Sequence, residues 1–138
     1  MKTLIAAALL LAAPTAALAQ DPGKITFEFA TGSSTGTIRA ALFSSADAYR
    51  RGPAVASTEA RVSGGVTVVV FENLPAGDYA MRAFHDWDDD GEMDTNPFGM
   101  PTEPYAFSNN AVGNMGPASW DRASFRVEGP VTQAIELK

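Results

Sequence analysis

Glycine, proline and serine interrupt this chain so often that a long helix has no room after residue 21. The 138 residues include 12 glycines and 9 prolines, which favour turns over helix interiors. Between the turns, apolar and polar side chains alternate, as in Ile25–Phe29, Thr37–Phe43 and Asp78–Asp86. A period of two is typical of strands with one buried face. We therefore expect an all-β fold, an antiparallel β-sandwich of about seven strands, with a small barrel as the alternative.

Several further segments have a more specific expected place in that fold. The β-branched run Val66–Phe71 predicts a central strand, and the more polar Val55–Val62 predicts an edge strand. Ser45 can cap a short helical turn that follows it. Arg122–Val127 and Val131–Leu137 predict a closing pair of strands at the end of the chain.

A long connection runs from Asn96 to Asp121 and is rich in proline, glycine and asparagine. Loops of this length inside a compact domain are usually functional or disordered. Phe98, Tyr105, Phe107 and Trp120 are spaced along it. We expect these aromatic side chains to anchor an ordered loop on the sheet.

The N-terminus has the features of a secretory signal peptide. Lys2 provides a positive charge, Leu4–Ala13 is a short apolar run, and Ala17-Leu18-Ala19 is a small-residue cleavage site. We expect residues 1–19 to be removed and residues 20–138 to form one domain, either periplasmic or secreted, with no membrane insertion after cleavage. The alternative is an uncleaved membrane anchor, although the apolar run is shorter than a spanning helix requires.

Charge and cysteine content narrow the range of partners. The formal net charge is −6 at pH 7, which disfavours binding to nucleic acid or to an anionic membrane surface. The sequence contains no cysteine, so disulfides and thiolate metal sites are excluded. A protein or a carbohydrate is the expected kind of partner, and the oligomeric state stays open.

The acidic segment Asp86–Asp94 carries six carboxylates and no basic residue. Asp86, Asp88 and Asp90, then Gly91 and Asp94, follow positions 1, 3, 5, 6 and 9 of a calcium loop. That spacing can direct alternate oxygens onto one hard cation, while the glycine permits a sharp bend. The alternative is a solvated acidic turn.

The calcium hypothesis needs a ligand from outside this segment. Position 12, where an EF-hand has a bidentate carboxylate, is Pro97. Glu103 is the preferred replacement, with Asn96 and Asp121 as the alternatives. We therefore predict a calcium site formed by five acidic residues of the segment and one beyond it: Asp86, Asp88, Asp90, Glu92 through its backbone carbonyl, Asp94 and Glu103.

Three other polar residues are candidates for a ligand surface. His85 is the only histidine and could serve as a base or a metal ligand; the alternative is a hydrogen-bonded residue that anchors the end of a strand. Asn109 and Asn110 could bind sugar or peptide groups, or could simply stabilise a turn. We predict no catalytic residue, because no nucleophile motif accompanies the histidine.

Two groups of motifs resemble known families. Leu74-Pro75-Ala76-Gly77-Asp78-Tyr79 is similar to a turn of Ig-like and transthyretin-like sandwiches. A second group follows in a fixed order: Phe84-His85-Asp86, the acidic segment, Gly99-Met100-Pro101-Thr102-Glu103-Pro104-Tyr105, Phe107-Ser108-Asn109-Asn110-Ala111 and Gly116-Pro117-Ala118-Ser119-Trp120.

That order resembles a family of exported bacterial proteins known only as domain of unknown function 2141. This chain departs from the family pattern at Ala106, where the family has glycine, and in having Asp at loop positions where Asn is common. The resemblance implies export and an Ig-like or transthyretin-like sandwich, and it implies no activity. We expect a non-enzymatic binding or accessory module with a calcium loop. The alternative is a metal-dependent hydrolase or carbohydrate-active protein that uses the same loop.

Overall fold

The computed structural model describes residues 21–138, so the predicted signal peptide at residues 1–19 lies outside the described residues. Within the described residues, eight strands and three short helices follow one another. They are β1 (Gly23–Ala30), β2 (Thr37–Phe43), α1 (Ala46–Arg51), β3 (Ala56–Arg61), β4 (Val66–Leu74), β5 (Gly77–Asp86), β6 (Tyr105–Phe107), the 3₁₀ helix η1 (Ser108–Asn110), α2 (Trp120–Ala123), β7 (Phe125–Val127) and β8 (Pro130–Glu136).

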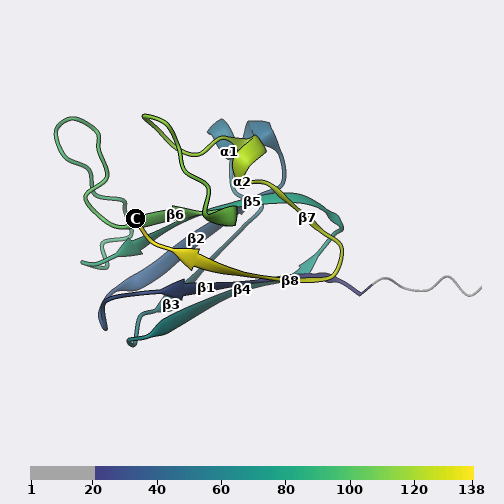
Figure 1. The fold of residues 1–138 in the computed structure, drawn as a ribbon, viewed down its shortest axis with the longest axis horizontal. Coiled ribbons are helices and arrows are strands. Elements are labelled where there is room, and N and C mark those ends of the chain that lie inside the picture. The colour runs from purple at the N-terminus through teal and green to yellow at the C-terminus, as the bar shows by residue number, and fades with distance from the viewer. Residues whose placement is uncertain (1–20) are drawn as a thin grey trace, which may run out of the picture.

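The strands form two sheets, and the predicted β-sandwich is confirmed with about eight strands. One sheet has the order β4-β1-β8, and the other has the order β3-β2-β5-β6, with β7 also paired to β5. Neighbouring strands are antiparallel except β1 and β8, which are parallel. Figure 1 shows helices α1 and α2 gathered at the top of the view, above β5 and β6.

The alternating sequence pattern places one face of each sheet in a shared core. In β1, Ile25, Phe27 and Phe29 are fully buried. The ring of Phe27 makes edge-on contacts with Phe71 of β4, at 6.2 Å between centroids, and with Phe125 of β7, at 6.1 Å. Aromatic pairs in this geometry add to the gain from burying the rings. Packing of these side chains therefore holds the two sheets together, in a chain that has no cysteine for a disulfide.

Two strand predictions need correction. Val66–Phe71 is predicted to be central, but β4 is an edge strand that pairs only with β1. Its β-branched residues reflect strand propensity, which does not distinguish a central strand from an edge. The predicted closing pair is also wrong, because β7 pairs with β5 and β8 pairs with β1. The Glu128-Gly129-Pro130 turn carries the chain from one sheet to the other.

The long connection is ordered: it adds β6 to the five-stranded sheet beside β5, and then forms η1 and the start of α2. Phe107 is buried, and Trp120 packs edge-on against Tyr49 of α1 with 5.9 Å between centroids. Phe98 is predicted to be a further anchor, but it is 91% exposed. It lies at the tip of a turn that Asn96 closes by accepting hydrogen bonds from the Phe98 and Met100 amides. These hydrogen bonds from Asn96, and not packing of the Phe98 ring on the sheet, therefore order the turn.

Candidate metal centre

The candidate centre begins at Asp86, where β5 ends. The side chain of Asp86 is completely buried. Its Oδ2 atom accepts hydrogen bonds from Arg39 Nε at 2.6 Å and from the Gly91 amide at 2.9 Å. Arg39 comes from the paired strand β2, and Gly91 reaches back because its φ of 85° permits a turn that other residues adopt only with strain. The strand end and the loop are therefore joined through one carboxylate oxygen.

The other oxygen of this carboxylate, Asp86 Oδ1, is buried and has no hydrogen-bond partner among the described residues. Buried carboxylate oxygens almost always have a donor or a cation. A buried carboxylate oxygen without a partner lowers the stability of the fold, and a bound cation or donor would recover that free energy. This oxygen is the strongest local indication of a missing ligand.

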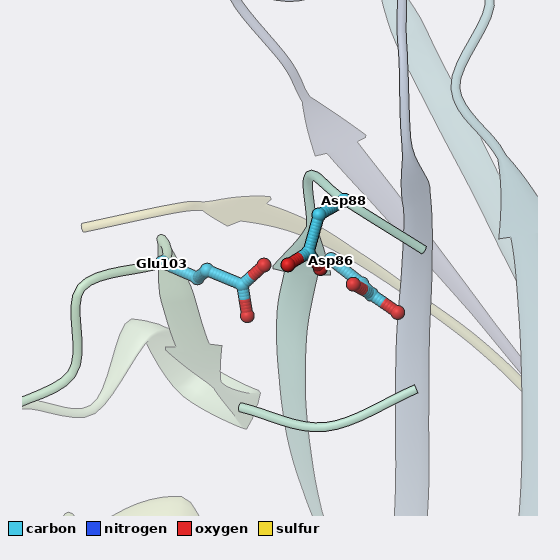
Figure 2. Close-up of side chains that lie close together, drawn as sticks. All are labelled: Asp86, Asp88 and Glu103. Carbon is cyan, nitrogen blue, oxygen red and sulfur yellow. The ribbon is translucent and has the colours of Figure 1, made fainter. Parts of the chain in front are cut away.

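Two more carboxylates converge on the same position. Asp86, Asp88 and Glu103 each offer an oxygen, and these oxygens lie within 4.8 Å of one another. Figure 2 shows one Asp86 oxygen directed to the side where Asp88 and Glu103 lie. Glu103 is itself buried, with 5% of its surface exposed. This acidic cluster can hold a metal ion.

Glu103 also fixes the two halves of the loop to each other. Its Oε1 atom accepts from the Trp87 amide at 2.9 Å, and its Oε2 atom accepts from the Asp94 amide at 3.1 Å. The residue therefore orders the beginning and the end of the acidic segment from a position in the following strand connection. Glu103, the residue that we preferred as the ligand from outside the acidic segment, thus lies beside Asp86 and Asp88.

A second, more exposed trio shares one residue with the first. Asp88, Asp90 and Asp94 also bring one oxygen each within 4.8 Å of one another. Asp88 accepts a hydrogen bond from the Asp90 amide at 3.3 Å, and Asp90 accepts one from the Glu92 amide at 2.9 Å. These local bonds bend the loop so that alternate carboxylates lie on one side.

The intervening Asp89 faces the sheet instead. Its two oxygens accept from the Thr37 hydroxyl at 2.6 Å and from Arg61 at 3.3 Å. Its positive φ of 55° marks the reversal of the chain at this point. Asp89 is thus turned away from its neighbours Asp88 and Asp90, whose carboxylates meet with that of Asp94.

The carboxylates differ in their proton affinity. Burial raises the pKa of Asp86, but hydrogen bonds from Arg39 and the Gly91 amide outweigh it, so the pKa is lowered overall. For Asp88, partial desolvation and the neighbouring acidic groups raise the pKa. For Asp94, desolvation and the charges of Asp90 and Glu103 raise the pKa as well. The arrangement thus keeps Asp86 ionised and concentrates negative charge that a hard cation would neutralise.

Not every predicted ligand joins these two trios. The exposed carboxylate of Glu92 belongs to neither, whereas the ligand predicted from this residue is its backbone carbonyl; the Glu92 amide donates to Asp90. Of the alternatives to Glu103, Asn96 uses its side chain to close the turn at Phe98, and Asp121 lies in α2. The predicted carboxylates therefore divide into one trio with two buried members, Asp86 and Glu103, and a more exposed trio that shares Asp88 with it.

His85 has both ring nitrogens engaged in internal contacts. It is 2% exposed, its Nε2 lies 2.7 Å from the Thr35 carbonyl oxygen, and its Nδ1 accepts from Trp87 Nε1 at 3.0 Å. The carbonyl can only accept, so Nε2 carries the proton. Gly36 permits this packing, since a Cβ atom there would lie 2.9 Å from Nε2. The geometry matches the anchoring role that the sequence left as the alternative.

Asn109 and Asn110 also bond within the domain. The Asn109 amide nitrogen donates to the Arg122 and Ser124 carbonyls, and its oxygen accepts from Gln133. Asn110 donates to the Ala134 carbonyl and accepts from the Glu136 amide. Both residues have the positive φ that Asn tolerates well, 61° and 52°. Their side chains thus stabilise a turn against β8.

Sequence reasoning missed two residues of the centre. Arg39 is the basic partner of Asp86, and Gly36 makes room for His85. Arg39 was visible as a charged residue inside an otherwise apolar strand, a signal that a buried acid lies nearby. Gly36 looked like an ordinary turn residue, and only the structure shows that the His85 ring and the Asp86 carbonyl leave no space there for a Cβ atom.

None of the helices in the described part of the chain combines the length and the apolar character needed to cross a membrane. No curated protein and no solved structure shows significant similarity to the chain. One family profile matches residues 30–135, and its description is an uncharacterized protein conserved in bacteria, domain of unknown function 2141. The match covers the chain from the end of β1 to β8, including the whole acidic segment. The chain therefore belongs to this bacterial family, in agreement with the motifs that run from Phe84 to Trp120.

Proposed function

We propose that this protein is an exported, non-enzymatic binding or accessory module in which calcium orders the acidic segment. The observation that carries the proposal is the buried and unpartnered Asp86 Oδ1, which lies in a cluster with the Asp88 and Glu103 carboxylates. Without a cation, these groups are held together against their mutual repulsion.

Calcium suits the site better than the other common cations. All the candidate ligands are oxygens, which favours hard cations over zinc or copper. Magnesium demands a smaller octahedral shell and retains most of its waters, whereas calcium accepts six to eight oxygens from flexible loops. The exposed carboxylate of Asp90, the half-buried carboxylate of Asp94 and backbone carbonyls of the loop would complete such a shell.

The proposed role is structural and organising. Glu103 and Asp86 connect β5 to the turn that presents Phe98 and Met100 at its tip, with 91% and 60% exposure. Calcium at their carboxylates would stabilise that presentation. A protein or carbohydrate partner would then contact the ordered loop. Export rests on the predicted signal peptide at residues 1–19.

Thermal unfolding in EDTA and then in increasing calcium tests the proposal. With a dissociation constant of about 10⁻⁴–10⁻³ M, as in extracellular modules, calcium at about 10 mM should stabilise the native state by about 1.4–2.7 kcal/mol. Magnesium at the same concentration should give a smaller shift. Asp88→Asn should remove the calcium shift, because Asp88 belongs to both trios.

Two further variants sharpen the assignment. Asp78→Asn changes an exposed carboxylate far from the site, and it should keep the full calcium shift. Glu103→Gln should weaken calcium affinity by removing one buried charged ligand. If calcium produces no saturable shift, or if Asp88→Asn retains it, the proposed calcium site is wrong.

A further inference from the structure

The two edge strands of the three-stranded sheet, β8 and β4, differ in whether other segments of the chain hydrogen-bond to them. On the β8 edge, the Asn110 side chain bonds to the Ala134 carbonyl and the Glu136 amide, and the Tyr105 backbone pairs with Lys138 in both directions. These contacts occupy two outward hydrogen-bonding groups near the end of β8, and the chain just beyond the strand is held by the pairing with Tyr105. Covering an edge in this way is how proteins prevent unwanted strand pairing.

The β4 edge has no such cover within the described residues. The amide of Thr31 donates to the carbonyl of Gly65, which fixes the hydrogen-bonding phase of the β1–β4 ladder. Residues an even number of positions from Gly65 then face β1 with their backbone groups. The N–H and C=O groups of Val66, Val68 and Val70 therefore point away from the sheet, and no hydrogen bond to them from another segment is present among the described residues.

The side chains along this edge are apolar and exposed. Val66, Val68 and Val70 are 59%, 46% and 36% exposed. From Val66 to Phe71 the strand carries no charge and no proline, two features that commonly block edges. The edge of the other sheet at β3 is different, because Glu59 and Arg61 lie on it. A long, uncharged β-branched edge is a template for another strand.

We infer that a second copy of this chain pairs with β4, antiparallel, in a two-fold arrangement centred on Val68. This pairing places Val68 opposite Val68 of the second copy and Val66 opposite Val70 of the second copy. All these residues have outward backbone groups, so the ladder would close by reciprocal N–H to C=O bonds. The valines would form one continuous apolar row across the two sheets.

Charge favours a second copy at this strand over other parts of the surface. Each chain has a formal charge of −6, so two copies repel each other in general. The uncharged stretch from Val66 to Phe71 is where they can approach at the lowest electrostatic cost. Glu72, at the end of the strand, would face Gly64 of the second copy instead of another acid. The strand is thus complementary to itself in shape, hydrogen bonding and charge.

Sedimentation equilibrium over a wide concentration range tests this pairing, in EDTA to separate it from metal binding. The molar mass of the wild type should rise from one chain toward two. V68P removes only an outward N–H, so the β1–β4 ladder survives while the pairing is lost. V68K puts two like charges opposite each other and should raise the dissociation constant by about tenfold or more. In the single chain this lysine lies beside Glu28, its cross-strand neighbour, so folding should be kept.

A mixing experiment tests the register itself. V68E places a second acid beside Glu28, so its fold is first checked by circular dichroism; folded V68E alone should also stay a single chain. Mixing it with V68K should produce a heterodimer, because position 68 faces itself across the two-fold axis. V55K is the matched control, since Val55 is 56% exposed and lies outside β4; it should associate like the wild type. A wild type that stays at the mass of one chain at all concentrations overturns the inference. So does association that survives both V68P and V68K.

Discussion

Two polar regions follow strands of the five-stranded sheet, one after β5 and one after β6. They differ in whether their buried polar side chains find hydrogen-bond partners within the domain. The amide turn, Ser108–Asn110, satisfies its side chains within the domain: the Ser108 hydroxyl donates to the Ala123 carbonyl and accepts from the Met81 amide, and both asparagines bond to backbone groups. The acidic segment, Asp86–Asp94 with Glu103, leaves the buried Asp86 Oδ1 without a partner. A polar region whose side chains all find hydrogen-bond partners within the domain indicates a structural role. A buried polar atom without such a partner indicates a site for a bound ion or ligand.

The largest effect is expected from Arg39→Met, which removes the basic partner of a fully buried carboxylate. The unfolding free energy in EDTA should fall more than for a substitution in the amide turn or at Tyr49, because Asp86 would keep its charge without compensation. Calcium should recover part of the loss if Asp86 is a ligand. Urea unfolding in EDTA and in calcium measures both quantities.

Arg61→Met is the matched control for that experiment. Arg61 pairs with Asp89 at 3.3 Å, and its side chain is 76% exposed. An exposed pair is worth about 0–1 kcal/mol. If Arg39→Met costs no more than Arg61→Met, the buried pair does not hold the acidic segment.

The next effect belongs to the amide turn. Ser108→Ala removes a buried hydroxyl that bonds to two backbone groups, so the unfolding free energy should fall by about 1–3 kcal/mol. Calcium should not recover this loss, because both backbone partners of Ser108, in Met81 and Ala123, lie outside the acidic cluster. Ser119→Ala, at an exposed residue whose side chain makes no capping bond, should change stability by about 0.5 kcal/mol or less. If calcium did restore the stability of Ser108→Ala, its effect would not be specific to the acidic segment, and the distinction between the two regions would be wrong.

The smallest effect on stability is expected at alkaline pH, from the ionisation of Tyr49 in α1. Burial raises the pKa of Tyr49, although the nearby Arg82 opposes this in part. A raised folded pKa stabilises the native state below the unfolded pKa of about 10, and that stability is lost as the pH rises through the folded value. Tyr49→Phe should therefore weaken the fall in stability between about pH 9 and 11. Tyr79, whose pKa is also raised by burial, should keep some of that fall in the variant.

Urea midpoints of the wild type and of Tyr49→Phe at several pH values provide the measurement. At neutral pH the variant should lose about 0.5–1.5 kcal/mol, because the Tyr49 hydroxyl donates to the Ala118 carbonyl at 2.8 Å. Identical alkaline profiles for the two proteins would mean that Tyr49 ionises equally in the folded and unfolded states.

Local patterns were sufficient for much of the fold. The period-two alternation predicted β1, β2 and β5, and Ser45 caps α1 by accepting from the Ala48 amide, as expected. Position in a sheet was harder to predict: β4 is an edge, and β7 and β8 pair with other strands. Strand propensity describes one segment, whereas pairing depends on which segments the whole chain brings together. For the same reason Phe98 looked like an anchor and is a solvent-exposed tip.

The sequence by itself determined the ingredients of the candidate metal centre: alternate carboxylates, a glycine that permits the turn, and a glutamate that could replace the missing ligand. These follow from spacing along the chain, which fixes where neighbouring side chains can point. Only the tertiary structure decided that Asp86 is buried against Arg39, that Glu103 reaches it, that His85 is already engaged, and that one oxygen is left unpartnered. Burial and hydrogen-bond satisfaction depend on residues far apart in sequence, and folding alone brings those residues together.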